Sequence, residues 1–149
     1  MKTKYHYDSP IGMLCVETED NTITGLYLDS TIEEDKQETK LHAETHRQLM
    51  EYFQKKRTKF DLPIHPTGTE FQMKVWDALR TIPYGETRSY GELARMIDNP
   101  KACRAVGGAN NKNPIMIIIP CHRVINADGS LGGFGGGQAV KQYLLDLEK

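Results

Sequence analysis

The stretch FDLPIHPTG (60–68) divides the chain into two parts with different sequence patterns. Neither a helix nor a strand continues easily through it, because proline fixes φ and has no amide hydrogen to donate. Short alternating runs of apolar and polar residues precede the stretch, and apolar residues at helical spacing follow it. For 149 residues this predicts a small N-terminal domain over 1–66 and a second domain over 67–149.

The N-terminal part has the pattern of a small antiparallel sheet followed by a helix. The runs YHYDSPIGMLCVET and NTITGLYLD alternate, with turn signals at Ser9–Gly12 and at Asp20-Asn21. From Thr39 to Lys56 apolar residues recur at helical spacing between charges. We therefore expect a small antiparallel meander followed by one helix.

The second part begins with helix signals. The sequences TGTE and TEFQ (67–72) both have capping-box form, and SYGE (89–92) opens a further helix. Pro100 suits the first position of the next helix, PKACRAVGGAN (100–110). Two short helices joined by a turn indicate either a helix-turn-helix or a hairpin that only packs. Glycines and alanines around Arg104 favour the helix-turn-helix, because bare helix surfaces allow close approach to another surface.

The segment IMIII (115–119), bounded by prolines, is typical of a short buried strand that ends at Cys121. A thiol becomes a good nucleophile only when a base or positive charge favours its ionisation, and His122 is the obvious base. Adjacent residues on an extended chain point apart, so we expect a water between them. An acid should orient the imidazole; Asp146 and Glu148 both qualify. The fold class is thus mixed α/β of the α+β kind, with a mostly helical C-terminal domain in which a short strand carries the active cysteine.

Composition limits the classes of partner. A formal net charge of −1 argues against bulk attraction to a polyanion, yet a local basic face is predicted in the second part. The basic residues of the predicted face are Arg88, Arg95, Lys101, Arg104, Lys112 and Arg123.

The glycine-rich stretch DGSLGGFGGGQ (128–138) lacks the lysine of a phosphate loop and is interpreted as a mobile loop beside the cysteine.

The sequence also predicts a location. No apolar run approaches the ~20 residues that span a bilayer, and no signal peptide is evident. Three scattered cysteines form neither a disulfide framework nor a zinc motif, which favours free thiols in the cytoplasm without membrane association.

The motifs PCHRV (120–124), RAVGGANNKNP (104–114) and Ser89-Tyr90 resemble the O6-alkylguanine-DNA alkyltransferases, also called methylated-DNA–protein-cysteine methyltransferases. The resemblance covers residues 67–148 and extends to the N-terminal domain only in outline. It implies a DNA repair protein that flips O6-alkylguanine out of double-stranded DNA and transfers the alkyl group irreversibly to Cys121. Activity on O4-alkylthymine and cooperative assembly on DNA stay open; a monomer is expected.

The resemblance also implies a role for each matching residue. His122 is the base, acting through water, and Glu148 is its orienting acid. Tyr90 supports rotation of the nucleotide and donates a hydrogen bond to the purine, while Arg104 fills the gap in the base stack. Further residues with implied roles are Asn113, which ties the helix-turn-helix to the cysteine strand; Val124, whose carbonyl accepts from the guanine amine; Phe134 and Gly135 in the active-site loop; and Ala102, Ala105 and Arg123 at the DNA.

Two further expectations concern the groove and metals. The family binds the minor groove through its helix-turn-helix, and small residues around Arg104 fit that narrow space. The zinc ligands of some animal members have no counterpart here, so we expect neither a metal nor another cofactor.

Three alternatives compete with alkyl transfer. A lesion-binding relative would carry tryptophan in place of Cys121. A cysteine hydrolase would use Cys121, His122 and Glu148 on an ester or amide and would turn over repeatedly. A non-catalytic helix-turn-helix protein would bind undamaged operator DNA, with Cys121 incidental.

Overall fold

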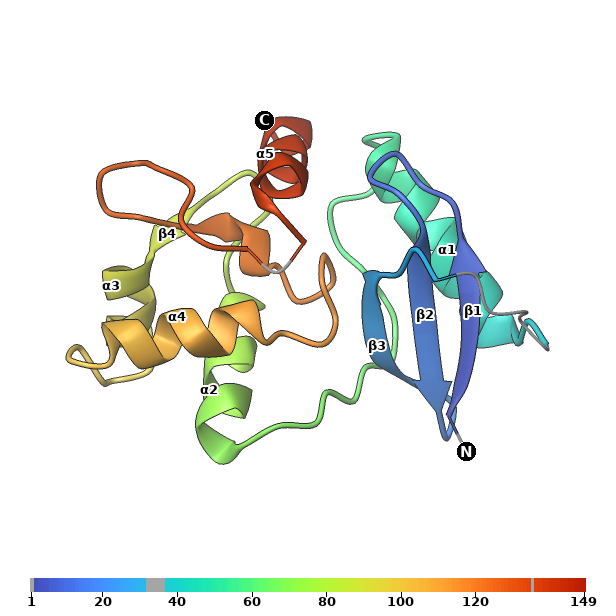
Figure 1. Ribbon diagram of the computed structural model, residues 1–149, viewed down its shortest axis with the longest axis horizontal. Helices are drawn as coiled ribbons and strands as arrows, with labels where there is room; N and C mark the ends of the chain where they lie inside the picture. Colours follow the sequence, from blue (N-terminus) through green and yellow to red (C-terminus); the bar gives the residue numbers. More distant parts are fainter. Residues whose placement is uncertain (1, 32–36, 135) are drawn as a thin grey trace. The chain divides into compact units, whose positions relative to one another are not determined.

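The computed structural model describes residues 2–31, 37–134 and 136–149 (Figure 1). They form two compact units, Met1–Pro66 and Thr67–Lys149, each with its own core. Within the described ranges, no helix combines the length and the apolar character needed to cross a membrane. The fold class expected from the sequence, a small sheet-and-helix domain before a mostly helical one, is confirmed.

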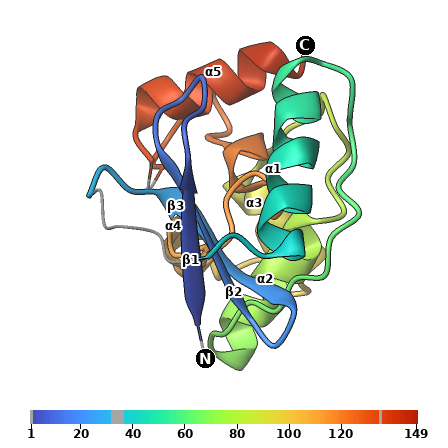
Figure 2. The same cartoon turned by 90° about the vertical axis from the view of Figure 1, so that its right-hand side faces the viewer.

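The N-terminal unit is a three-stranded antiparallel sheet with one helix packed on it (Figure 2). Asp20 and Asn21 both have positive φ, which is the conformation of a tight hairpin turn between the second and third strands. Thr39 caps the helix: its hydroxyl accepts from the His42 amide. The elements are β1 (Thr3–Tyr7), β2 (Leu14–Glu19), β3 (Thr22–Leu28) and α1 (Lys40–Phe53).

The C-terminal unit consists mainly of helices, with a two-stranded parallel pair beside them. Of the two overlapping capping boxes, the structure uses the one that starts at Thr69, and Ser89 caps a second helix as expected. The indole of Trp76 donates to the carbonyl of Ala109 at 2.9 Å and so ties the first helix of the unit to the end of the third. The elements are α2 (Glu70–Leu79), β4 (Arg88–Ser89), α3 (Tyr90–Met96), α4 (Cys103–Asn111), η1 (Cys121–Arg123), β5 (Val124–Ile125) and α5 (Gln138–Leu147).

Helices α3 and α4 form the predicted pair joined by a tight turn, in which Asp98 has a φ of 58°. The start of the second helix differs from the prediction. Pro100 lies in the turn, and α4 begins at Cys103 after Ala102, which has no side chain able to cap it. The turn therefore extends three residues further than the proline suggested.

Candidate active site

The segment before the cysteine is buried as expected, but it is not a strand. Ile115 makes a single β-bridge, residues 116–118 form a turn, and Ile117 has a φ of 70°. The Asn113 side chain closes this curl, because it accepts from the Ile115 amide at 3.0 Å and donates to the Ile119 carbonyl at 2.7 Å. Backbone groups that a strand would pair with a neighbour are thus satisfied within the segment.

Cys121 opens the short helix η1, and its side chain is almost completely buried. Its carbonyl accepts from the side-chain Nδ2 of Asn110 at 3.3 Å, a contact that the sequence did not indicate. Burial raises the pKa of the Cys121 thiol to about 11, although a hydrogen bond with Asn113 and the charge of Lys141 lower it. The thiol is therefore neutral at rest and needs a base for ionisation.

His122 and Glu148 form a buried pair 2.6 Å apart, measured from Nε2 to Oε2. A carboxylate can only accept, so the imidazole carries its hydrogen on Nε2 and leaves Nδ1 as an acceptor. Nδ1 is buried and makes no hydrogen bond with any described residue. Burial lowers the pKa of His122 despite the opposing effect of Glu148. The pair thus presents a neutral base. Asp146, the other acid considered, is exposed and bonded to Gln142 and Lys149.

Arg123 does not lie on the DNA-facing surface where the sequence placed it. It is 7% exposed, donates to both Glu148 oxygens at 2.8 and 3.1 Å, and donates to the Ile82 carbonyl at 2.7 Å. Two N–H groups of the guanidinium face the two carboxylate oxygens, and this bidentate pairing offsets the cost of burying both charges. The DNA-contact interpretation of Arg123 was therefore wrong: the residue holds Glu148.

Lys141 is a fully buried residue of the site that the sequence analysis missed. Its ammonium donates to the carbonyls of Leu131 at 2.5 Å and Gly133 at 3.3 Å, and it lies 5.8 Å from the centre of the Tyr90 ring. Burial lowers the pKa of Lys141 to about 8, and the Cys121 thiol opposes this. The helical spacing of residues 141, 144 and 148 could have revealed Lys141, since it places the lysine on the same face as Leu144 of α5 and the C-cap residue Glu148.

Tyr90 and the glycine-rich loop meet at this lysine. The Tyr90 hydroxyl donates to the carbonyl of Gly133 at 3.4 Å. Burial raises the pKa of Tyr90, and the charge of the Cys121 thiolate raises it further. Phe134 is partly exposed in the same loop, and Gly135 lies outside the described residues. The structure thus brings Tyr90 and the loop together around Lys141.

The outer surface of α4 carries the small residues and the arginine noted in the sequence. Arg104 and Ala105 are exposed, Ala102 is partly so, and Val106 faces the core. A side chain at Gly107 would lie 3.8 Å from the Tyr90 ring, whereas one at Gly108 would meet nothing within 4 Å. Of the expected basic face, Arg88 pairs with Glu86. The exposed members are Arg95, Lys101, Arg104 and Lys112.

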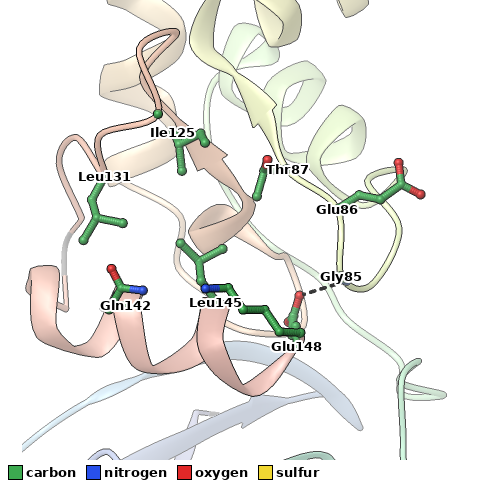
Figure 3. Close-up of a pocket in the computed structure, with 10 residues that line it drawn as sticks. Gly85, Glu86, Thr87, Ile125, Leu131, Gln142, Leu145 and Glu148 are labelled. Carbon is green, nitrogen blue, oxygen red and sulfur yellow. Dashed lines mark hydrogen bonds between the residues drawn. The ribbon is translucent and has the colours of Figure 1, made fainter.

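A pocket of about 230 Å³ lies beside Glu148, between α5 and the loops at β4 and β5 (Figure 3). The amide of Gly85 donates to Glu148 Oε1 at 3.4 Å, as the dashed line in Figure 3 shows. Cys121 is not among the lining residues. Because Cys121 does not line it, this pocket is not the site of the thiol.

Val124, the first residue of β5, is buried, and it pairs with Arg88 of β4.

A helix-turn-helix unit that carries a buried thiol and a His–Glu pair is the arrangement of a DNA-binding protein with a cysteine nucleophile. Two family models match the chain, described as "6-O-methylguanine DNA methyltransferase, ribonuclease-like domain" over residues 3–66 and "6-O-methylguanine DNA methyltransferase, DNA binding domain" over 70–149. The chain belongs to the 6-O-methylguanine DNA methyltransferase family, as the resemblance implied.

Individual relatives agree with this assignment. A methylated-DNA–protein-cysteine methyltransferase of Mycolicibacterium paratuberculosis is 50% identical over 95% of this chain and 89% of its own length. One from Methanosarcina acetivorans is 59% identical over 70% of this chain and 67% of its own length. The Mycobacterium tuberculosis O6-methylguanine methyltransferase crystal structure has a TM-score of 0.91 at 47% identity, covering 100% of this chain and 93% of its own. The same enzyme in complex with DNA has a TM-score of 0.89 and covers 97% and 91%.

Proposed function

We propose that this protein repairs O6-alkylguanine in double-stranded DNA by transferring the alkyl group to its own Cys121. The observation that carries the proposal is the buried Cys121 next to His122, whose Nε2 is held by Glu148 at 2.6 Å. A buried thiol with a raised pKa is inert until a base takes its proton. In this site Nδ1 of His122 is the base, and it accepts that proton through a water.

The reaction is a displacement at the alkyl carbon. The Cys121 thiolate attacks that carbon, the carbon–sulfur bond forms, and the bond from carbon to the purine oxygen breaks. The guanine leaves with the electron pair of that bond and takes up a proton, and a hydrogen bond from Tyr90 to the purine stabilises its developing charge. The carbon–sulfur bond of the resulting thioether is not hydrolysed under mild conditions, so each protein acts once.

The base must leave the stack before it can reach a buried thiol. Loss of stacking costs a few kcal/mol, and an inserted side chain restores part of it. Arg104 is exposed on α4 and surrounded by small residues, so it suits this insertion in the narrow minor groove. Ala102 and Ala105 permit the close approach, Phe134 stacks on the extruded base, and the Val124 carbonyl accepts from its amine. Gly135, outside the described residues, belongs to the same active-site loop as Phe134 in this proposal. Asn113 holds the cysteine segment against the helix-turn-helix.

The proposal assigns residues 67–149 to alkyl transfer and DNA binding, and residues 1–66 to a separate N-terminal domain. A cytoplasmic location is part of it, because Cys121 must stay reduced to react and all three cysteines are free.

The test is the intact mass of the protein after exposure to excess methylated duplex. We expect one methyl group per chain, on the peptide that contains Cys121. The amount of repaired DNA should rise in a burst equal to the protein concentration, with no later turnover. Cys121→Ala should abolish alkyl transfer and keep DNA binding, because the binding energy comes from contacts with the DNA phosphate backbone. Cys103→Ser, which alters an exposed thiol, is the matched control and should react normally.

The same experiment separates the alternatives. A cysteine hydrolase would return to its starting mass and turn over. A non-catalytic helix-turn-helix protein would gain no mass and would bind undamaged operator DNA. Either result would overturn the proposal.

A further inference from the structure

Three side chains with different donor atoms meet on the N-terminal sheet, in the unit that does not contain Cys121. His6 comes from β1, Cys15 from β2, and Asp29 follows β3 directly. Their imidazole nitrogen, thiol sulfur and carboxylate oxygen all lie within 4.8 Å of one another. Alkyl transfer makes no use of this cluster, so its chemistry needs a separate explanation.

The strand register brings the three residues together. His6 is directly opposite Cys15 in the antiparallel pair, and Cys15 is opposite Tyr27 on the other side. Asp29 lies two residues beyond Tyr27 and therefore projects from the same face of the sheet. The amide of Asp29 donates to the Met13 carbonyl at 2.9 Å, which fixes its backbone beside β2. Three adjacent strands thus hold the donors on a rigid support.

Contrary to the expectation from the sequence that no metal binds, we propose that His6, Cys15 and Asp29 bind one zinc ion, with a water as the fourth ligand. Zinc prefers imidazole nitrogen, thiolate sulfur and carboxylate oxygen in a tetrahedral arrangement, in which neighbouring ligand atoms are about 3.3–3.8 Å apart. His6 Nε2 and Asp29 Oδ2 are already 3.1 Å apart. The widest separation must shorten by about 1 Å, which small side-chain rotations supply.

The burial of the three residues suits an ion that enters from one side. Cys15 is fully buried, the His6 side chain is 8% exposed, and the Asp29 side chain is 25% exposed. The carboxylate therefore marks the accessible edge of the site. The thiolate lies deepest, where water competes least for the metal.

Charge also favours a divalent cation at this position. A neutral imidazole, a thiolate and a carboxylate carry two negative charges together, so a bound Zn²⁺ makes the site neutral and lowers the cost of its burial. Binding releases the Cys15 proton to solvent, because zinc takes the thiolate form. Other charged groups on this part of the sheet are Lys4 and Glu17, and Glu17 is bonded to Thr24 at 2.9 Å and to Lys2 at 3.5 Å.

A simpler arrangement would be a His6–Asp29 hydrogen bond next to a neutral buried thiol. The two arrangements differ in a property that can be measured. Only the zinc site gives a metal–sulfur bond at Cys15, and only the zinc site couples metal binding to the stability of the fold.

The experiment uses the full chain, stripped of metal with a chelator and titrated with Co²⁺ as a spectroscopic substitute for zinc. We expect one equivalent to bind, with a thiolate-to-cobalt charge-transfer band that one equivalent of Zn²⁺ removes. Cys15→Ser should abolish the band, and His6→Gln or Asp29→Asn should weaken binding at least tenfold. Zinc should raise the melting temperature of the unsubstituted protein and leave that of Cys15→Ser unchanged.

Two controls identify the thiol. Cys103→Ser and Cys121→Ala should keep the band, because neither sulfur belongs to the cluster. Should Cys15→Ser fail to fold, the His6 and Asp29 variants carry the test, since both retain the thiol. The proposal is overturned if no charge-transfer band forms, if the band survives in Cys15→Ser, if both other ligand variants bind Co²⁺ as tightly as the unsubstituted protein, or if the band disappears in Cys121→Ala.

Discussion

His122 Nε2 and Glu148 Oε2 are 2.6 Å apart in the core of the C-terminal unit, although 26 positions separate the residues. The same carboxylate accepts two hydrogen bonds from Arg123. Because Glu148 is held from both sides, it can set only one imidazole tautomer, with the hydrogen on Nε2. The lone pair on Nδ1 is then available to take a proton, which is the property the proposed reaction requires.

Glu148→Gln should slow alkyl transfer strongly while leaving DNA binding intact. The amide cannot hold the imidazole in the same way, and Arg123 is left as a buried charge without its partner, which costs about 3–5 kcal/mol. The single-turnover rate with methylated duplex and the midpoint of urea unfolding measure the two effects. The matched control is Asp146→Asn in the same helical turn, because Asp146 is exposed. Equal losses in both variants would contradict the role given to Glu148.

Substitution of Arg123 should lower the stability of the fold, whereas substitution of Arg104 should not. Arg123→Met removes the guanidinium that holds Glu148, so stability and transfer should fall while affinity for undamaged duplex changes less than twofold. Arg104→Ala should leave stability unchanged, since the residue is exposed, and should slow repair of duplex far more than reaction with the free alkylated base. Thermal melting, a DNA titration and transfer rates on both substrates check this pair. A large loss of DNA affinity in Arg123→Met would restore the surface role.

Lys141→Met should loosen the glycine-rich loop and slow transfer. The substitution leaves the carbonyls of Leu131 and Gly133 without their ammonium donor, at a cost of about 1–3 kcal/mol for each group that stays buried. It also removes a positive charge that lowers the pKa of the Cys121 thiol. Hydrogen exchange over residues 128–134 should accelerate, and the transfer rate at neutral pH should fall at least tenfold. Unchanged exchange and rate would show that the lysine only fills space.

Labelling of Cys121 by iodoacetamide in the free protein should increase steeply with pH. Burial raises the pKa of this thiol from 9.0 to about 11, so the thiolate fraction grows about tenfold per pH unit up to that value. Peptide masses after timed labelling between pH 7 and 10 give the rates, and circular dichroism confirms that the fold persists. A plateau already at pH 8 would mean that the thiol is ionised in the resting protein.

Elements with local signals could be predicted from the amino-acid sequence alone. Asp20-Asn21 predicts the hairpin turn, since these residue types tolerate positive φ, and the capping boxes at Thr69 and Ser89 predict helix starts within a few residues. The Pro-rich break at 60–68 marks the change from strands to helices, because proline also acts through its local backbone restriction. The PCHRV motif by itself predicts Cys121 as the reactive residue, and the intact-mass experiment tests that prediction.

The contacts between residues far apart in the sequence became known only from the folded structure. Residues 115–119 have strand-like composition, yet they curl, because Asn113 supplies the hydrogen bonds that a neighbouring strand would have supplied. Arg123 looks like a surface base in the sequence, yet it is buried against Glu148. The cluster of His6, Cys15 and Asp29 depends on the register of three strands. Local propensity reports what each segment prefers alone, whereas charge pairing, burial and register depend on partners far along the chain, which are brought together only by folding.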